Sequence, residues 1–241
     1  MIYYGYYSHI DGMFLVGITR FLYQRRVVMI LETGIMIENA ITYVKQIFAA
    51  DSSGHDYHHT IRVYRLAVEI AKQENADMQI VQLAALLHDV DDAKLSPETY
   101  ASKRKAVDFM KGNGVDNEII ETVCKIIEEV SFAGNDSVVP STIEGKCVQD
   151  AIGAIGIARA FAYGGSKGRK IYDPEIKPLI NMSKKEYQQN QNSTSINHFY
   201  EKLLLLKDMM NTDAAKEKAW HRQFIMESYL EEFMAEWEGE R

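Results

Sequence analysis

The segment Leu83-Ala84-Ala85-Leu86-Leu87 is apolar on every side and most constrains the fold of this chain. Asp77 precedes it at a position where its side chain can cap a helix that begins at Met78 and runs to about Asp89. A helix without a polar face must be surrounded by other elements. The segment therefore predicts a central, buried helix.

Most of the remaining chain shows the spacing of apolar residues that is typical of amphipathic helices. We see neither a convincing run of alternating β-branched residues nor an internal repeat, so we predict a single all-α helical bundle. Residues 164–195 are glycine-rich, then basic, then polar, and we predict a long loop there. The last expected helix carries Trp220, Phe224, Leu230, Phe233 and Trp237 on its apolar face. Two helices have expected ends: the one from Ser96-Pro97 ends at Gly112 and Gly114, and the one from Asn117 ends at Phe132. The expected helices begin at Met36, Asp56, Met78, Ser96-Pro97, Asn117, a capping box of Ser141 and Glu144, near Ile196, and ahead of Trp220.

Composition limits the class of protein. The 241 residues are 46% hydrophobic and 25% charged, as in an ordinary globular protein. The net charge of −7 argues against broad binding to nucleic acids or anionic membranes. No apolar run approaches the roughly 20 residues that a membrane span requires. The two cysteines, Cys124 and Cys147, favour a reducing, cytoplasmic setting.

Residues 1–35 differ from the rest, with five of the 14 tyrosines and no lysine. We expect Met36 to be the functional start and the preceding segment to be a poorly ordered leader. The alternative is an extension that packs through its tyrosines. The expected domain covers residues 36–241.

The buried helix ends in an unusual group of polar residues, His88, Asp89, Asp91 and Asp92. Carboxylates are unfavourable near the negative end of a helix, and burying them without partners is costly. A divalent cation such as Mn²⁺, Fe²⁺, Zn²⁺ or Mg²⁺ would resolve this conflict. The alternative is a solvated helix end with a hydrogen-bonded core histidine. A second group of histidines, His55, His58 and His59, favours the metal.

These residues resemble the HD superfamily of metal-dependent phosphohydrolases, which are all-helical. The blocks G-H-D-x-x-H-x-x-R-V, L-L-H-D-x-D-D and Q-D-A-I-G-A-I-G-I-A-R-A-F are similar to those of a subgroup of small single-domain bacterial proteins, the YedJ/YpgQ-like subgroup. The resemblance runs from about Met36 to the C-terminus. It implies that His59, His88 and Asp89 are metal ligands.

The resemblance also implies roles beside the metal. Asp92 matches the acidic residue that orients or deprotonates water, and its spacing from Asp89 returns to nearly the same helix face. Arg62, one turn after His59, can hold a phosphate through its planar fork of donors. We expect Lys94 to neutralise substrate charge and His55 to contact the substrate or support the metal.

One departure from the subgroup affects the fourth ligand. The subgroup resembles Q-D-A-D-R-L-D-A-I-G-A-I-G, whereas this chain runs from Gln149-Asp150 directly into Ala151-Ile152-Gly153. Five missing residues turn a helix by about 140°. Asp150 is left as the candidate fourth ligand after local repacking. The site could equally be weakened, open or lost, with Asp150 on the surface.

We therefore expect a cytoplasmic hydrolase of phosphate esters whose substrate is a nucleotide, with cleavage of a nucleoside triphosphate to the monophosphate and pyrophosphate as the first reaction to test. The alternatives are a nucleotide sensor without turnover and a helical partner-binding protein. A homodimer is compatible with the sequence. We expect His198, in a late helix, to face the core and to be hydrogen-bonded.

Overall fold

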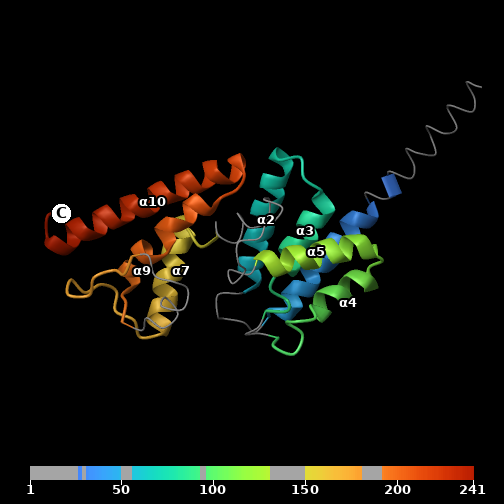
Figure 1. Ribbon diagram of the computed structural model, residues 1–241, viewed down its shortest axis with the longest axis horizontal. Coiled ribbons are helices and arrows are strands. Elements are labelled where there is room, and N and C mark those ends of the chain that lie inside the picture. Colours follow the sequence, from blue (N-terminus) through green and yellow to red (C-terminus); the bar gives the residue numbers. More distant parts are fainter. Residues whose placement is uncertain (1–26, 29–30, 50–55, 93–95, 131–149, 181–191) are drawn as a thin grey trace, which may run out of the picture.

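The protein is an all-helical bundle, as the sequence predicts. The computed structural model describes residues 27–28, 31–49, 56–92, 96–130, 150–180 and 192–241, and these contain helices and turns but no strand. Two groups of helices lie side by side (Figure 1). The helices are residues 31–47, α2 (Tyr57–Gln73), α3 (Met78–Leu87), α4 (Arg104–Gly112), α5 (Asn117–Val130), α7 (Gly153–Ser166), α9 (Ser195–Glu201), the 3₁₀ helix η1 (Leu203–Met209) and α10 (Asp213–Glu238).

Helix α3 lies at the centre of the first group. Residues 83–87 are fully buried, which confirms the prediction from their apolar character. The Asp77 carboxylate accepts hydrogen bonds from the backbone N–H groups of Gln79 and Ile80 at 3.0 and 3.1 Å, so the predicted cap is also confirmed. Helix α3 packs against α2 and α5. His88, which directly follows α3, is thereby held inside the protein.

Helix α2 joins the two groups of helices. Val63 and Ala67 pack with residues of α3, whereas Ile70 belongs to the core formed with α9, η1 and α10. The side chain of Asp56 accepts a hydrogen bond from the backbone N–H of His59 at 2.6 Å and caps the first turn. The cap fixes the backbone of the first turn of α2, and the later turns are held by packing against both groups of helices.

The start of α4 differs from the prediction. The expected helix from Ser96-Pro97 begins only at Arg104, because residues 97–103 form turns and Lys103 has a φ of 48°. The carboxylate of Asp91 accepts hydrogen bonds from the N–H groups of Lys105 and Ala106 at 3.2 and 3.0 Å. A cap from outside the helix thus sets its start, and local sequence did not indicate it.

Other boundaries also move. The helix predicted to begin at Met36 already includes residues 31–35. Helix α7 continues to Ser166, so the predicted loop starts three residues later than expected. The first late helix breaks at Lys202 into α9 and η1. The predicted capping box of Ser141 and Glu144 lies outside the described residues, as do residues 1–26.

Helix α10 shows a further error in the prediction. Leu230 is buried as expected, but Trp220, Phe224 and Trp237 are 66%, 54% and 49% exposed. Trp220 and Phe224 stack on each other instead, with ring centroids 6.4 Å apart.

None of the described helices has both the length and the apolar character that crossing a membrane demands.

His198 in α9 makes the stability of the fold depend on pH. Burial lowers the pKa of its imidazole to about 4. The unfolded chain, with a histidine pKa of about 6.5, binds the proton more readily than the folded protein does. The contribution of the neutral His198 imidazole to the free energy of unfolding is therefore complete above pH 6.5 and is lost as the pH falls towards 4.

We expect His198→Gln to remove this pH dependence. Between pH 7 and pH 4.5 the wild type should lose up to about 2–3 kcal/mol more free energy of unfolding than the variant, since one pKa unit corresponds to about 1.4 kcal/mol. Urea unfolding at the two pH values measures the difference. The exposed His58, replaced in the same way, is the matched control. Equal losses in wild type and His198→Gln would contradict the expectation.

Candidate metal centre

Two helices bring His59, His88 and Asp89 together. His59 lies in the first turn of α2, and His88 and Asp89 directly follow α3. Asp89 Oδ2 lies 3.1 Å from Nε2 of His88 and 3.5 Å from Nε2 of His59. The side chains are 6%, 5% and 12% exposed for His59, His88 and Asp89. The sequence predicted these residues as metal ligands, and the fold places them in one buried cluster.

Hydrogen bonds fix the orientation of both imidazole rings. Nδ1 of His88 lies 3.0 Å from the carbonyl oxygen of Ala85, which can only accept a hydrogen bond. Nδ1 of His59 lies 2.7 Å from a carboxylate oxygen of Asp150. In a neutral imidazole, both contacts place the ring proton on Nδ1 and leave the lone pair on Nε2. Each lone pair is on the nitrogen that lies near Asp89.

This donor set fits a divalent cation. Three acceptor atoms, two imidazole nitrogens and one carboxylate oxygen, lie within 4.8 Å of one another. Ligand atoms at 2.0–2.2 Å from a common tetrahedral ion would be about 3.4 Å apart, close to the two distances from Asp89. Imidazole and carboxylate suit Zn²⁺, Fe²⁺ or Mn²⁺. The residues present can therefore hold the metal, although the donor set does not identify it.

Asp150 is buried beside this cluster, so the surface alternative is wrong. Its Oδ2 lies 2.7 Å from His59 Nδ1, 2.7 Å from Arg159 Nη1 and 3.1 Å from Arg62 Nη2, and its Oδ1 lies 2.8 Å from Arg62 Nε. Burial alone would raise the pKa of the carboxyl, but hydrogen bonds from His59 and Arg62 outweigh it and hold the pKa at about 2. The group is ionised at neutral pH.

Arg62 and Arg159 approach Asp150 from α2 and α7. The hydrogen bond to Asp150 raises the pKa of Arg62, so its charge is permanent. The two side chains are 34% and 33% exposed, and both therefore reach the solvent beside the cluster. Sequence reasoning predicted Arg62 but missed Arg159. An arginine inside the otherwise apolar stretch Gly153–Phe161 was the available signal.

The aspartates that follow the cluster have different environments. Asp91 is buried and caps α4, which explains how one of the unusual carboxylates is tolerated without a metal. The backbone N–H of Asp92 bonds to the carbonyl of Asp89 at 3.0 Å, so a single turn separates the two residues. The predicted site residues His55 and Lys94 lie outside the described residues.

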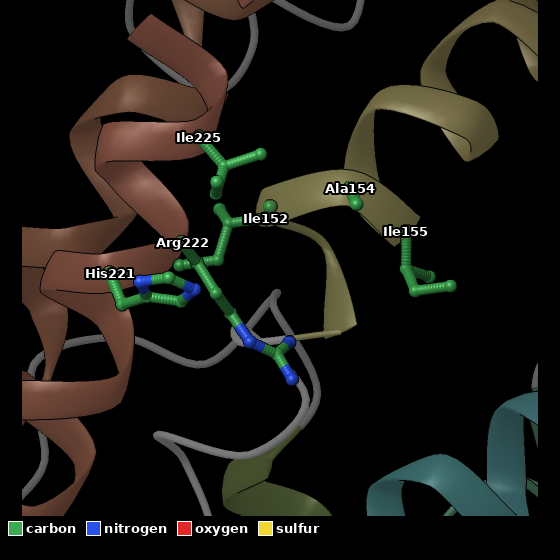
Figure 2. Close-up of a pocket in the computed structure, with 7 residues that line it drawn as sticks. Ile152, Ala154, Ile155, His221, Arg222 and Ile225 are labelled. Carbon is green, nitrogen blue, oxygen red and sulfur yellow. The ribbon is translucent and has the colours of Figure 1, made fainter. Parts of the chain in front are cut away.

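Helix α10 contributes a third arginine, whose charge is felt at Asp150. Arg222 extends from α10 alongside the start of α7 (Figure 2), and its charge interacts with that of Asp150. A Cβ atom at Gly153 would lie 2.9 Å from Cγ of Arg222, and Gly153 has a φ of 75°. Glycine at this position therefore permits both the turn after Asp150 and the close approach of α10.

Residues 56–151, which include the three ligand candidates and Asp150, match the HD domain family. The chain is 40% identical to the protein YpgQ of Bacillus subtilis over 200 residues, which cover 80% of this chain and 89% of YpgQ. Identity and coverage of this extent establish common descent along most of the chain.

Solved structures share the fold. An HD-superfamily hydrolase from Bacillus thuringiensis is 42% identical with a TM-score of 0.71, over 86% of this chain and 98% of the hydrolase. The crystal structure of YpgQ in complex with ADP is 36% identical with a TM-score of 0.67, over 83% of this chain and 97% of YpgQ. The sequence blocks, the histidine–aspartate cluster and these relatives agree, and the chain belongs to the HD superfamily of hydrolases.

Proposed function

We propose that this chain is a metal-dependent phosphohydrolase of nucleotides, and that cleavage of a nucleoside triphosphate to the monophosphate and pyrophosphate is the first reaction to test. The observation that supports it best is the buried convergence of two imidazole Nε2 atoms and the Asp89 carboxylate beside solvent-reaching arginines. The ADP complex of the relative YpgQ supports a nucleotide as the ligand.

His59, His88 and Asp89 would hold the metal. When bound, a divalent cation lowers the pKa of a water molecule and polarises a phosphoryl group. The Nδ1 hydrogen bonds of both histidines keep their Nε2 lone pairs available for this purpose. These residues thus provide a site that is oriented before the ion binds.

The arginines would hold the substrate phosphates. Asp150 carries one negative charge, whereas Arg62 and Arg159 together carry two positive charges. Two guanidinium groups against the single carboxylate that they contact leave donors and charge for an anionic substrate. Arg222 adds to this field from α10. We assign phosphate binding to Arg62, with Arg159 beside it.

Proton transfer and further substrate contacts fall to residues near the cluster. We assign to Asp92, one turn after Asp89, the orientation of the attacking water and removal of its proton. His55 and Lys94 flank the cluster in sequence, before α2 and after Asp92. We assign them to contacts with the substrate.

A nucleotide panel tests this proposal. Purified protein with added Mn²⁺ is incubated with nucleoside mono-, di- and triphosphates, and phosphate, pyrophosphate and nucleotide products are separated by ion exchange. We expect turnover that disappears with a chelator and returns with excess Mn²⁺. Pyrophosphate as the product would support cleavage of triphosphates to monophosphates. Turnover that the chelator leaves unchanged would contradict a metal-dependent reaction.

The pairing of Asp150 with two arginines favours a second candidate, a nucleotide sensor with little or no turnover. Arg62 places its Nε and one Nη on Asp150, so it has fewer donors for a phosphate. Calorimetric binding of a nucleotide without release of phosphate or pyrophosphate, in the presence of Mn²⁺, would favour this function over hydrolysis.

A further inference from the structure

Asp150 lies on the opposite side of the His59 ring from Asp89. His59 presents Nδ1 to Asp150 at 2.7 Å and Nε2 to Asp89 at 3.5 Å. The two nitrogens of an imidazole point in different directions, so one ion cannot readily take Nε2 of His59, Asp89 and a carboxylate that contacts Nδ1. The arrangement separates Asp150 from the ligand cluster.

The lone pairs of Asp150 are already engaged. A carboxylate offers about four lone-pair sites, and four nitrogen atoms lie within 3.1 Å of its two oxygens. Two of the three donor residues are arginines, which bear a permanent positive charge. A cation bound to Asp150 would have to displace them or lie beside like charges. The carboxylate is thus surrounded by donors and not by other metal ligands.

We propose that Asp150 is a positioning residue, which fixes the tautomer and the ring direction of His59, and that the metal is held by His59, His88 and Asp89 without it. The inference rests on the proposed function for the presence of a metal. Asp150 accepts a hydrogen bond from the Nδ1–H of His59 and thereby directs Nε2 at the ion. Arg62 and Arg159 hold the carboxylate in place from two helices.

Close packing of the backbone at Gly153 and Gly156 restricts where Asp150 can move. A Cβ atom at Gly156 would lie 2.2 Å from the carbonyl oxygen of Ala151, so the backbone just after Asp150 packs tightly on the first turn of α7. Gly153 lies against the side chain of Arg222. The backbone that carries Asp150 is thus held between α7 and α10, which keeps the carboxylate on the Nδ1 side of His59.

Cobalt binding distinguishes a ligand from a positioning residue. Metal-free wild type, Asp150→Asn and Asp89→Asn are titrated with Co²⁺, and the visible absorption of the bound ion reports its ligand set. We expect wild type and Asp150→Asn to bind one ion with the same band positions and intensities, and the affinity of Asp150→Asn to fall by about 10–100-fold. Asp89→Asn should lose the spectrum.

The proposal would be overturned if the Co²⁺ spectrum of Asp150→Asn changed in band position and intensity as that of Asp89→Asn does, because Asp150 would then be a ligand. An unchanged Co²⁺ affinity would overturn it as well. A wild type that binds no Co²⁺ refutes the proposal along with metal dependence. Co²⁺ binding by a wild type that hydrolyses no nucleotide with Mn²⁺ refutes the proposed hydrolysis alone.

Arg159→Gln keeps the test decisive if Asp150→Asn does not fold. This variant retains Asp150 and removes one of its donors. We expect the wild-type Co²⁺ spectrum and an affinity lowered by less than tenfold. A new spectrum together with a higher affinity would show that the released carboxylate becomes a ligand, which would overturn the proposal.

Discussion

Asp89→Asn is expected to lower kcat/KM for nucleotide hydrolysis by about 10³-fold or more, which corresponds to roughly 4 kcal/mol of lost transition-state stabilisation. Asparagine keeps the shape of the side chain but removes the negative charge, and the Asp89 carboxylate lies 3.1 and 3.5 Å from the Nε2 atoms of His88 and His59. Steady-state kinetics with Mn²⁺, together with metal content by elemental analysis, measure the effect.

Helix α3 itself offers the matched control. Asp77 lies at the opposite end of α3, is exposed, and caps the helix through backbone N–H groups. Asparagine caps helices about as well as aspartate does. We therefore expect Asp77→Asn to retain wild-type activity and melting temperature. Hydrolysis by Asp89→Asn at the wild-type rate would contradict the assignment of this residue to the metal.

Phe199→Ala is expected to destabilise the protein by about 3–5 kcal/mol, since the cavity left by a fully buried phenylalanine adds to the lost burial. Phe199 is 0% exposed, and its ring lies 6.0 Å from that of Phe161 in α7 and 6.1 Å from that of Tyr229 in α10. Urea denaturation followed by circular dichroism gives the change in free energy of unfolding.

Phe224→Ala provides the comparison for the same chemical change on the surface. Phe224 is 54% exposed and stacks on Trp220 of the same helix. We expect this substitution to lower the free energy of unfolding by less than about 1 kcal/mol, because the Phe224 side chain buries little apolar area. A loss for Phe199→Ala no greater than that for Phe224→Ala would show that α9 does not join α7 and α10 in one core.

Local sequence was sufficient where the determinant lies within one element. The buried character of α3 follows from residues 83–87, and the caps at Asp56 and Asp77 follow from the residues beside them. The meeting of His59 with His88 and Asp89 required the family resemblance, because the two segments are joined only by the packing of α2 on α3.

Local sequence was insufficient where a residue from another element determines a helix boundary or the surroundings of a side chain. The start of α4 depends on Asp91, which is 14 residues before Lys105 in the sequence. The surroundings of Asp150 depend on Arg62, which is 88 residues earlier in the sequence, and on Arg159 of α7. In α10 the apolar period predicted one buried face, but no described helix covers Trp220 or Phe224.

The buried carboxylate of Asp91 couples the segment that carries the candidate ligands His88 and Asp89 to α4, a helix that carries none of them. Asp91 is two residues after Asp89, and it holds the first turn of α4 through two backbone N–H groups. A displacement of α4 would therefore pull on the peptide that carries Asp89. We therefore expect substitutions on the outer surface of α4 to alter metal affinity at the candidate site, while His59, His88 and Asp89 stay unchanged.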